Sequence, residues 1–318
     1  MEGAFIMNGT VRPKNLLVYY GYPNCFNSSV NQWSNEKVAA NMAKYDLLVF
    51  ADGLQSTSHP DHNNAKIIIS RVKSLRPDAL IFGYVTINQT MANFITKTNE
   101  WKSDMDDVDG IFLDEAGYDY GKTRDEFNER CIHVKSKEFI CFANAWDLDY
   151  ILGTNDNASY PNSTYNVNLH ESLLGKDDWV MLESLAVNTS SYGQGYASAS
   201  DWVARVNKAL DMRERYDVNL AAVNVINNDN ANGQDYYDFC HRAALVSDMD
   251  ANGSSDTSYG SSSATVAFWD REDAVSEQDD IAIEEDASTG DIYYRYTPGQ
   301  KITLDFRTDN QSSSFLSW

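Results

Sequence analysis

Three carboxylates close two apolar segments of this chain, and their types and positions suit the hydrolysis of a glycosidic bond. Asp114 and Glu115 end the run GIFLDE (110–115), and Glu183 ends the run WVMLES (179–184). This reaction needs one carboxyl group that protonates the leaving oxygen and another that attacks the anomeric carbon or activates water. Neighbouring carboxylates can also raise one another's pKa, which prepares an acid beside a base. An arbitrary Asp-Glu pair after a strand more often caps a loop, so the position of the pair in the fold decides between the two interpretations.

Short apolar runs of strand length recur along the chain and alternate with longer helical patterns. Most runs are continuous, which is typical of parallel strands buried on both faces. The eight runs cover residues 15–22, 46–52, 80–87, 110–115, 139–145, 179–184, 220–226 and 264–269. This rhythm predicts an α/β fold, a (β/α)₈ TIM barrel. An open doubly wound sheet would alternate in the same way, but no strand is followed by a glycine-rich nucleotide-binding loop.

The composition changes on both sides of the predicted barrel. We expect residues 1–14 to form an N-terminal arm, 15–270 the catalytic barrel domain, and 271–318 a short C-terminal β-rich extension. In this extension DIYYRYTP and KITLDF predict a β-hairpin around a Pro-Gly turn. The segment ANGSSDTSYGSSSA (251–264) is rich in Gly and Ser and is predicted to be a loop.

The C-terminal strand ends of a (β/α)₈ barrel surround its active site, and several of these ends are polar or aromatic here. Aromatic rings can stack on the C–H faces of sugars, while carboxylates and amides hold their hydroxyl groups. Besides the catalytic candidates, the predicted substrate-binding residues are Tyr20, Asp52, Tyr84, Tyr118, Asn144, Trp146, Asn224 and Trp269. No metal and no cofactor are predicted, because the sequence H-P-D-H at 59–62 is interpreted as a turn.

The formal net charge of −22 narrows the choice of partner. Such a protein is repelled by nucleic acid and by anionic membranes, so we expect neither as a partner and favour a neutral or cationic polymer. No apolar run approaches the roughly 20 residues of a membrane span. The four cysteines contain no C-x-x-C pair, which argues against a disulfide framework or a zinc site. The N-terminal sequence lacks the basic and apolar regions of a secretory signal, although a mature secreted protein would look the same.

The segment LIFGYVTINQT…NEWKSDMDDVDGIFLDEAGYDYG resembles the spherulin-4-like family of glycoside hydrolases, which is related to endo-α-1,4-polygalactosaminidases. Its pattern is a G-Y-V strand, a spacer helix that ends near a Trp, and then V-D-G-I-F-hydrophobic-D-E. FANAWDLDYILG (142–153) and DDWVMLES (177–184) resemble the family's later strands, and the resemblance covers roughly residues 15–230. The chain departs from the family where Ala-Trp replaces an Asn-Pro-Gly-like turn, and in its long C-terminal extension.

The resemblance implies a metal-independent (β/α)₈ barrel that acts on α-1,4-linked galactosamine or N-acetylgalactosamine polymers. It also implies that Asp114, Glu115 and Glu183 lie in the active site, with Asp114 as the nucleophile and Glu183 as the acid/base. A polymer with free amines is cationic, so an acidic enzyme would attract it.

Two classes of function remain open from the sequence. One is an endo-acting glycoside hydrolase that depolymerises an amino-sugar exopolysaccharide. The other is a non-catalytic carbohydrate-binding or structural component of a virion tail or surface appendage, with the C-terminal extension as an arm that contacts an assembly partner. Both fit an extracellular or virion-surface location. Convergence of the three carboxylates within about 5–9.5 Å would favour the enzyme, whereas a carboxylate paired with an Arg would favour the binding role.

Overall fold

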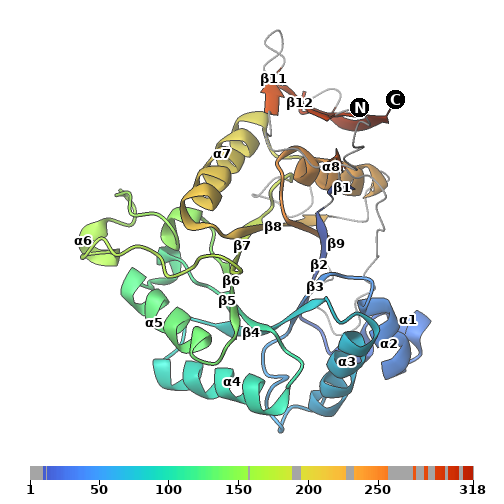
Figure 1. Ribbon diagram of the computed structural model, residues 1–318, viewed down its shortest axis with the longest axis vertical. Helices are drawn as coiled ribbons and strands as arrows, with labels where there is room; N and C mark the ends of the chain where they lie inside the picture. Colours follow the sequence, from blue (N-terminus) through green and yellow to red (C-terminus); the bar gives the residue numbers. More distant parts are fainter. Residues whose placement is uncertain are drawn as a thin grey trace, which may run out of the picture.

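The computed structural model describes residues 10–11, 13–156, 158–187, 195–226, 233–256, 275–276, 283–285, 291–297, 300–307 and 311–317. Eight parallel strands close into a barrel in the order of the sequence, seen end-on in Figure 1. These strands are β2 (Lys14–Tyr19), β3 (Leu47–Phe50), β4 (Leu80–Thr86), β5 (Gly110–Asp114), β6 (Ile140–Asn144), β7 (Trp179–Glu183), β8 (Asn219–Ile226) and β9 (Ala251–Asp256). The predicted (β/α)₈ barrel is confirmed.

The last barrel strand is not the predicted one. Strand β9 comes from the Gly/Ser-rich segment that was expected to be a loop, whereas the run at 264–269 lies outside the described residues. The small residues of β9 fit its position beside β2, because a Cβ atom on Gly253 would lie 2.7 Å from the carbonyl oxygen of Leu16. Tertiary contact thus overrides the low strand propensity of this segment.

Helices form the outer ring of the barrel (Figure 1). They are α1 (Ser28–Asn31), α2 (Asn35–Met42), α3 (His62–Leu75), α4 (Met91–Asp104), α5 (Arg124–Lys135), α6 (Asn162–Tyr165), α7 (Ala199–Tyr216) and α8 (Gly233–Val246), with 3₁₀ turns η1 (Pro23–Cys25), η2 (Tyr118–Tyr120) and η3 (Leu148–Tyr150). Side-chain oxygens accept backbone N–H groups at several helix starts, which satisfies donors that the helix itself leaves unpaired. The capping residues are Ser34, Thr90, Thr123 and Ser198.

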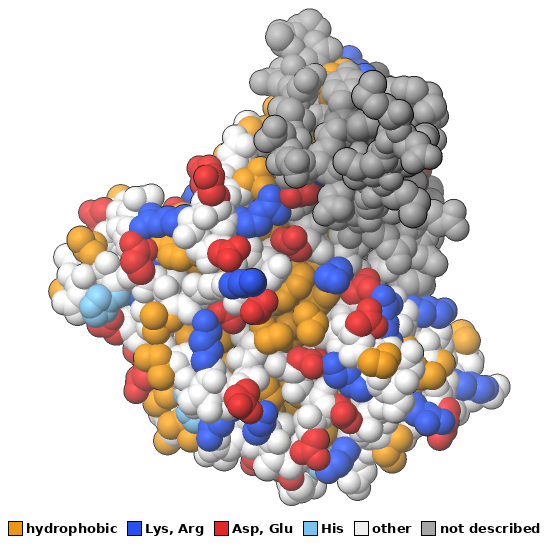
Figure 2. All heavy atoms as spheres, viewed as in Figure 1, with side chains coloured by type: hydrophobic (Ala, Val, Ile, Leu, Met, Phe, Trp, Pro, Cys, Tyr) orange, Lys and Arg blue, Asp and Glu red, His pale blue; other side chains and the backbone are white. Residues whose placement is uncertain are grey.

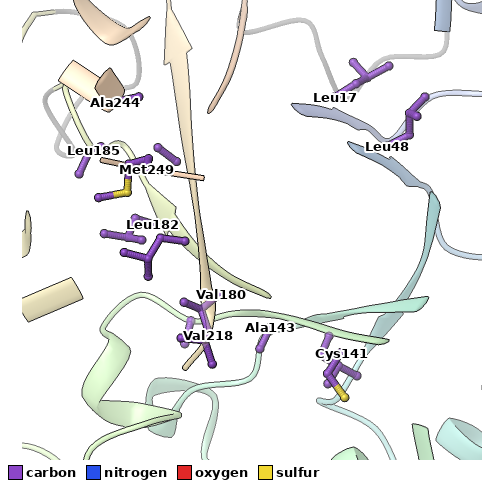
Figure 3. Close-up of a cluster of buried hydrophobic side chains, with 14 of the residues drawn as sticks. Leu17, Leu48, Cys141, Ala143, Val180, Leu182, Leu185, Val218, Ala244 and Met249 are labelled. Atoms are coloured by element: carbon purple, nitrogen blue, oxygen red, sulfur yellow. The ribbon is translucent and has the colours of Figure 1, made fainter. Parts of the chain in front are cut away.

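Successive side chains of each barrel strand point alternately inward and outward, and so form two apolar layers. One set of side chains fills the barrel, and it includes Phe82, Phe112, Phe142, Trp179 and Met181. The intervening residues point outward and pack under the helices, as Figure 3 shows for Leu17, Leu48, Cys141, Ala143, Val180 and Leu182. Because the side-chain period of a strand is two, this parity also decides which residues at the strand ends can face the barrel axis.

Four aspartates line the N-terminal end of the barrel, and we call them the base aspartates. They directly precede β3, β5, β7 and β9, and are Asp46, Asp109, Asp178 and Asp250. Each carboxylate accepts the backbone N–H of a residue in the preceding strand at 2.6–2.9 Å; these residues are Asn15, Ile81, Cys141 and Leu220. Each is also paired with a cation, respectively Arg76, Lys73, Lys135 and Arg213. The base aspartates therefore tie neighbouring strands and helices together.

The C-terminal extension forms a four-stranded antiparallel sheet of β11 (Ile283–Glu285), β12 (Ile292–Thr297), β13 (Gln300–Asp305) and β14 (Ser312–Ser317). The predicted hairpin is confirmed as β12 and β13, and a separate pair joins β1 (Thr10–Val11) to β10 (Val275–Ser276). The rings of Tyr293 and Phe306 each lie 5.3 Å from that of Trp202 on α7. An aromatic cluster thus anchors the sheet on the barrel.

Charges of both signs intermingle on the described part of the face that Figure 2 shows, with hydrophobic side chains near its centre. Among the described residues, no helix is long and apolar enough to span a bilayer. All four cysteines are buried free thiols.

Candidate active site

Three polar side chains meet where β5, β6 and β7 end. Asp114, Asn144 and Glu183 have the same strand parity as the barrel-filling Phe112, Phe142 and Met181, so all three face the axis at the C-terminal mouth. The carboxylate-bearing strands are separated by β6, which pairs with both of them in parallel register. Segments about seventy residues apart in sequence therefore place their acidic groups on one rim.

Asn144 bridges the two carboxylates. Its Nδ2 donates to Oδ1 of Asp114 at 2.8 Å and to Oε1 of Glu183 at 2.7 Å. Since both oxygen atoms contact one nitrogen, they lie no more than about 5.5 Å apart. Oδ1 of Asn144 is buried and has no hydrogen-bond partner in the described part of the structure. The bridge fixes the spacing of the carboxylates and leaves an acceptor oxygen beside them.

Glu115 reaches the same rim through an unusual backbone conformation. Its φ of 54° lies in the left-handed region, which costs roughly 1–2 kcal/mol for a residue with a side chain. In this conformation the N–H of Glu115 donates to Oδ1 of Asp114 at 2.9 Å, and its Oε2 accepts from Oγ1 of Thr86 at 2.6 Å. Ser184, which follows Glu183, has a φ of 52°. In both strands the residue that directly follows the axis-facing carboxylate thus has a left-handed backbone conformation. Backbone strain from such conformations clusters at functional sites.

The environment of Glu183 favours its protonated form. Burial raises the pKa of this carboxyl, the negative charge of Asp114 raises it further, and the hydrogen bond from Asn144 opposes both effects. Arg205 of α7 lies nearby, but its guanidinium donates to the backbone carbonyls of Glu183 and Ser184 rather than to the carboxylate. A carboxyl with a raised pKa is suited to act as a general acid.

Two tyrosines complete the mouth around the carboxylates. Tyr84 hydrogen-bonds Asp114, and its pKa is raised mainly by burial and then by that carboxylate. Its ring packs edge-on against Tyr20 at 5.5 Å. Tyr120, on η2, is 45% exposed, and its pKa is raised by burial and by the charges of Glu115, Asp119, Asp114 and Glu183. Tyr120 was not predicted from the sequence, because it lies on η2 in the loop after β5 and not at a strand end.

Several predicted substrate-binding residues lie elsewhere or have other contacts. Tyr118 is 3% exposed, accepts a hydrogen bond from Arg124 and stacks on Tyr150, so it packs the loops instead of facing the mouth. Asn224 is buried and accepts the N–H of Ala186, because its parity in β8 turns it away from the axis.

The other predicted residues divide between the rim and more distant places. Asp52 forms an ion pair with Lys97 at 2.6 Å, yet it lies close enough to Tyr84 to raise the pKa of its hydroxyl. Trp146 is 50% exposed and lines a cavity outside the barrel. Trp269 lies outside the described residues.

Two cavities border the strand ends. A small one of about 80 Å³ enters the barrel beside Tyr20, Glu183 and Ser254. A larger one of about 730 Å³ lies between the ends of β6 and β7, helix α7 and the C-terminal sheet, and we call it the flank cavity. Asp114, Glu115 and Glu183 do not line the flank cavity. Within the described ranges, no group of three or more His, Cys, Asp or Glu residues could hold a metal ion.

Comparison with known proteins gives distant structural matches. The glycoside hydrolase domain of PelA from Pseudomonas aeruginosa matches with a TM-score of 0.44 and 10% identity, covering 79% of this chain and 97% of that domain. CpGH84B matches with a TM-score of 0.43 and 12% identity, over 77% of this chain and 45% of the other. N-acetylneuraminate lyase from Fusobacterium nucleatum matches with a TM-score of 0.37 and 10% identity, over 78% and 71%.

No protein-family model and no curated protein sequence matched this chain. The structural matches have different activities, and at such low identity they do not distinguish between them. The spherulin-4-like family assignment therefore stays a prediction.

Proposed function

We propose that this protein is a glycoside hydrolase that uses Asp114 and Glu183 as its two catalytic carboxyl groups. The observation that carries the proposal is the shared contact of both carboxylates with Nδ2 of Asn144. Retaining glycosidases hold their carboxyl groups about 5–5.5 Å apart, whereas inverting enzymes need about 6.5–9.5 Å to admit a water molecule. The short bridge therefore favours a retaining, two-step mechanism.

In the first step, Glu183 donates its proton to the glycosidic oxygen while an oxygen of Asp114 attacks the anomeric carbon. The bond to the leaving sugar breaks, and a glycosyl ester on Asp114 forms. Tyr84 and the N–H of Glu115 hold the attacking carboxylate in place by hydrogen bonds. Because the pKa of Glu183 is raised, its carboxyl group keeps the proton that this transfer needs.

In the second step, Glu183 acts as a base. Formation of the ester removes the negative charge of Asp114, which is one cause of the raised pKa of Glu183. The pKa of Glu183 then falls, so the carboxylate can take a proton from water as the water attacks the anomeric carbon. Hydrolysis releases the sugar and restores both carboxyl groups to their starting states.

We propose an amino-sugar polysaccharide such as α-1,4-linked galactosamine or its N-acetylated form as the substrate, cleaved by endo action. The sequence resemblance around residues 80–121 supports this choice, and so does the net charge of −22, which attracts a polymer with protonated amines. The tyrosines at the mouth offer faces for sugar stacking.

The test is a reducing-end assay on a panel of galactosamine-containing and other bacterial polysaccharides. Wild-type protein is expected to release reducing ends from the galactosamine polymers, and Asp114→Asn and Glu183→Gln are expected to abolish this release. Activity that survives both substitutions would remove these residues from the mechanism. Polysaccharide binding without any cleavage by wild-type protein would instead support the carbohydrate-binding alternative.

A further inference from the structure

The flank cavity has the size and lining of a ligand site, although it lies outside the barrel. Its volume of about 730 Å³ is within the range of small-molecule pockets, roughly 300–1,000 Å³. Aromatic side chains line it from three different segments: Trp146 after β6, Tyr196 before α7, and Phe306 after β13. The C-terminal extension thus supplies part of a cavity that the barrel alone would not form.

Trp146 is the feature of this cavity that is most like a sugar-binding platform. It is 50% exposed, which leaves much of its indole ring unburied on the cavity wall. An aromatic face can stack on the C–H face of a sugar and can also attract a protonated amine. Trp146 follows Asn144, the last residue of β6, by two residues, so the cavity and the mouth both border the end of this strand.

An ion-pair cluster holds the loop that carries Trp146. Nζ of Lys208 on α7 contacts Oδ1 of Asp147 at 2.9 Å and Oδ2 of Asp149 at 2.7 Å. The N–H of Asp149 also donates to Asp147 at 3.0 Å. This loop is therefore tied to the helix that forms the opposite wall, and the platform is positioned before any ligand arrives.

The charges in the cavity favour a cationic or neutral ligand over an anionic one. Three carboxylates line it, those of Asp147, Asp201 and Asp291, against two cations. Lys208 is already shared between two aspartates, and Arg205 is bound to the backbone carbonyls after β7. A protonated amine near Asp201 or Asp291 would gain a charge-assisted hydrogen bond.

We propose that the flank cavity is a second binding site for the amino-sugar polysaccharide, beside the mouth that cleaves it. The proposal rests on the proposed function for the class of ligand, but not on the catalytic mechanism. One polymer chain could occupy both sites only if it is long enough to pass around the ends of β6 and β7. The flank cavity would then increase the affinity for long chains without touching the bond that is cleaved.

The test uses the catalytically inactive Glu183→Gln protein and an α-1,4-linked galactosamine hexasaccharide, with binding measured by isothermal titration calorimetry. Two sites are expected per chain, and adding Trp146→Ala should weaken one of them about tenfold. The matched control is Trp33→Ala, since Trp33 is also half-exposed, at 59%, but does not line the cavity. This control should leave both sites unchanged.

A second variant tests the charge preference. Asp201→Asn combined with Asp291→Asn should weaken binding of the free-amine hexasaccharide about tenfold while leaving the N-acetylated hexasaccharide unaffected. In the active protein, Trp146→Ala should slow cleavage of long polymer but not of short oligosaccharides.

The outcomes separate this inference from the proposed function. Cleavage by wild-type protein with a single binding site that Trp146→Ala leaves unchanged would overturn the inference and leave the proposed function standing. Loss of one site in Trp146→Ala without any cleavage by wild-type protein would support the inference and remove the hydrolase mechanism. Absence of all binding and cleavage would overturn both.

Discussion

At the base of the barrel, each of four aspartates accepts a backbone N–H and is paired with a Lys or Arg. At the mouth, Asp114, Glu115 and Glu183 accept hydrogen bonds from an amide, a hydroxyl or a backbone N–H. No ion pair to these three is found among the described residues, and the nearby Arg205 is bound to carbonyl oxygens. Carboxylates of the base are thus held by cations and by backbone N–H groups, whereas those of the mouth are held by hydrogen bonds alone in the described part of the structure.

The largest expected difference between the two regions is in activity. Glu183→Gln should lower kcat/KM on the polysaccharide substrate by about 10²–10⁴-fold, because the general acid is lost. Asp178→Asn, the matching substitution at the base, should change kcat/KM per folded molecule by less than about twofold. Reducing-end assays on both variants, normalised to the folded fraction, measure this contrast. Equal losses of kcat/KM in Glu183→Gln and Asp178→Asn would contradict the assignment of different roles to the mouth and the base.

The base should matter more for stability. Asp178→Asn should lower the free energy of unfolding by about 2–3 kcal/mol, because Asp178 accepts the N–H groups of Cys141 and Gly175 and pairs with Lys135. Urea denaturation measures the loss. Asp78→Asn is the control, since Asp78 is 80% exposed and lies 3.7 Å from Arg76. Asp78→Asn should leave the free energy of unfolding almost unchanged. A loss as large as that of Asp178→Asn would show that the base aspartates contribute no more to stability than an exposed aspartate does.

The hydrogen bonds from Asn144 to Asp114 and Glu183 should affect how kcat/KM depends on pH. Asn144→Ala removes a hydrogen bond that lowers the pKa of Glu183, so the pKa should rise and the alkaline limb of kcat/KM should move to higher pH. Loss of a bond to a charged group should also reduce kcat/KM about tenfold. Thr86→Val removes the side-chain donor to Glu115 and serves as the control. An alkaline limb that moves to lower pH in Asn144→Ala would contradict the assignment of Glu183 as the acid.

The smallest expected effect is a gain in stability at the mouth. The raised pKa means that folded Glu183 holds its proton more tightly than the unfolded chain does. Its ionised form therefore destabilises the fold, and this cost appears as pH rises from the unfolded pKa through the folded one. Glu183→Gln should accordingly raise the free energy of unfolding by about 1 kcal/mol at pH 7. The gain should vanish at a pH well below the ordinary pKa of a glutamate, and a loss at pH 7 would be inconsistent with a buried, unpaired acid.

Much of the fold could be predicted because buried parallel strands are continuous apolar runs, and seven such runs contain or overlap barrel strands. The eighth strand could not be predicted, because ANGSSD has a low strand propensity. It forms a strand through its pairing with β2 and β8. The rim residues Asp114, Asn144 and Glu183 followed from strand ends alone. Asn224 shows the limit of that approach, because parity along β8 turns its side chain outward.

Loop residues were harder to place than strand residues. Tyr118 and Tyr120 are two residues apart on η2, yet the first packs on Tyr150 while the second is exposed near the carboxylates. Tyr118 is held by Tyr150 and Arg124, which are distant from it in sequence or in another element, so no local sequence pattern indicates which tyrosine is buried. Likewise, the flank cavity needs the C-terminal sheet beside α7, which is a long-range contact.

The stereochemistry of cleavage tests most directly whether Asp114 and Glu183 work together at the spacing set by Asn144. Proton NMR of an α-1,4-linked galactosamine oligosaccharide, recorded before mutarotation, identifies the first anomer released. We predict the α-anomer, because two displacements at the anomeric carbon retain its configuration. Release of the β-anomer would contradict the account, since a single displacement by water needs carboxyl groups farther apart than the shared amide allows.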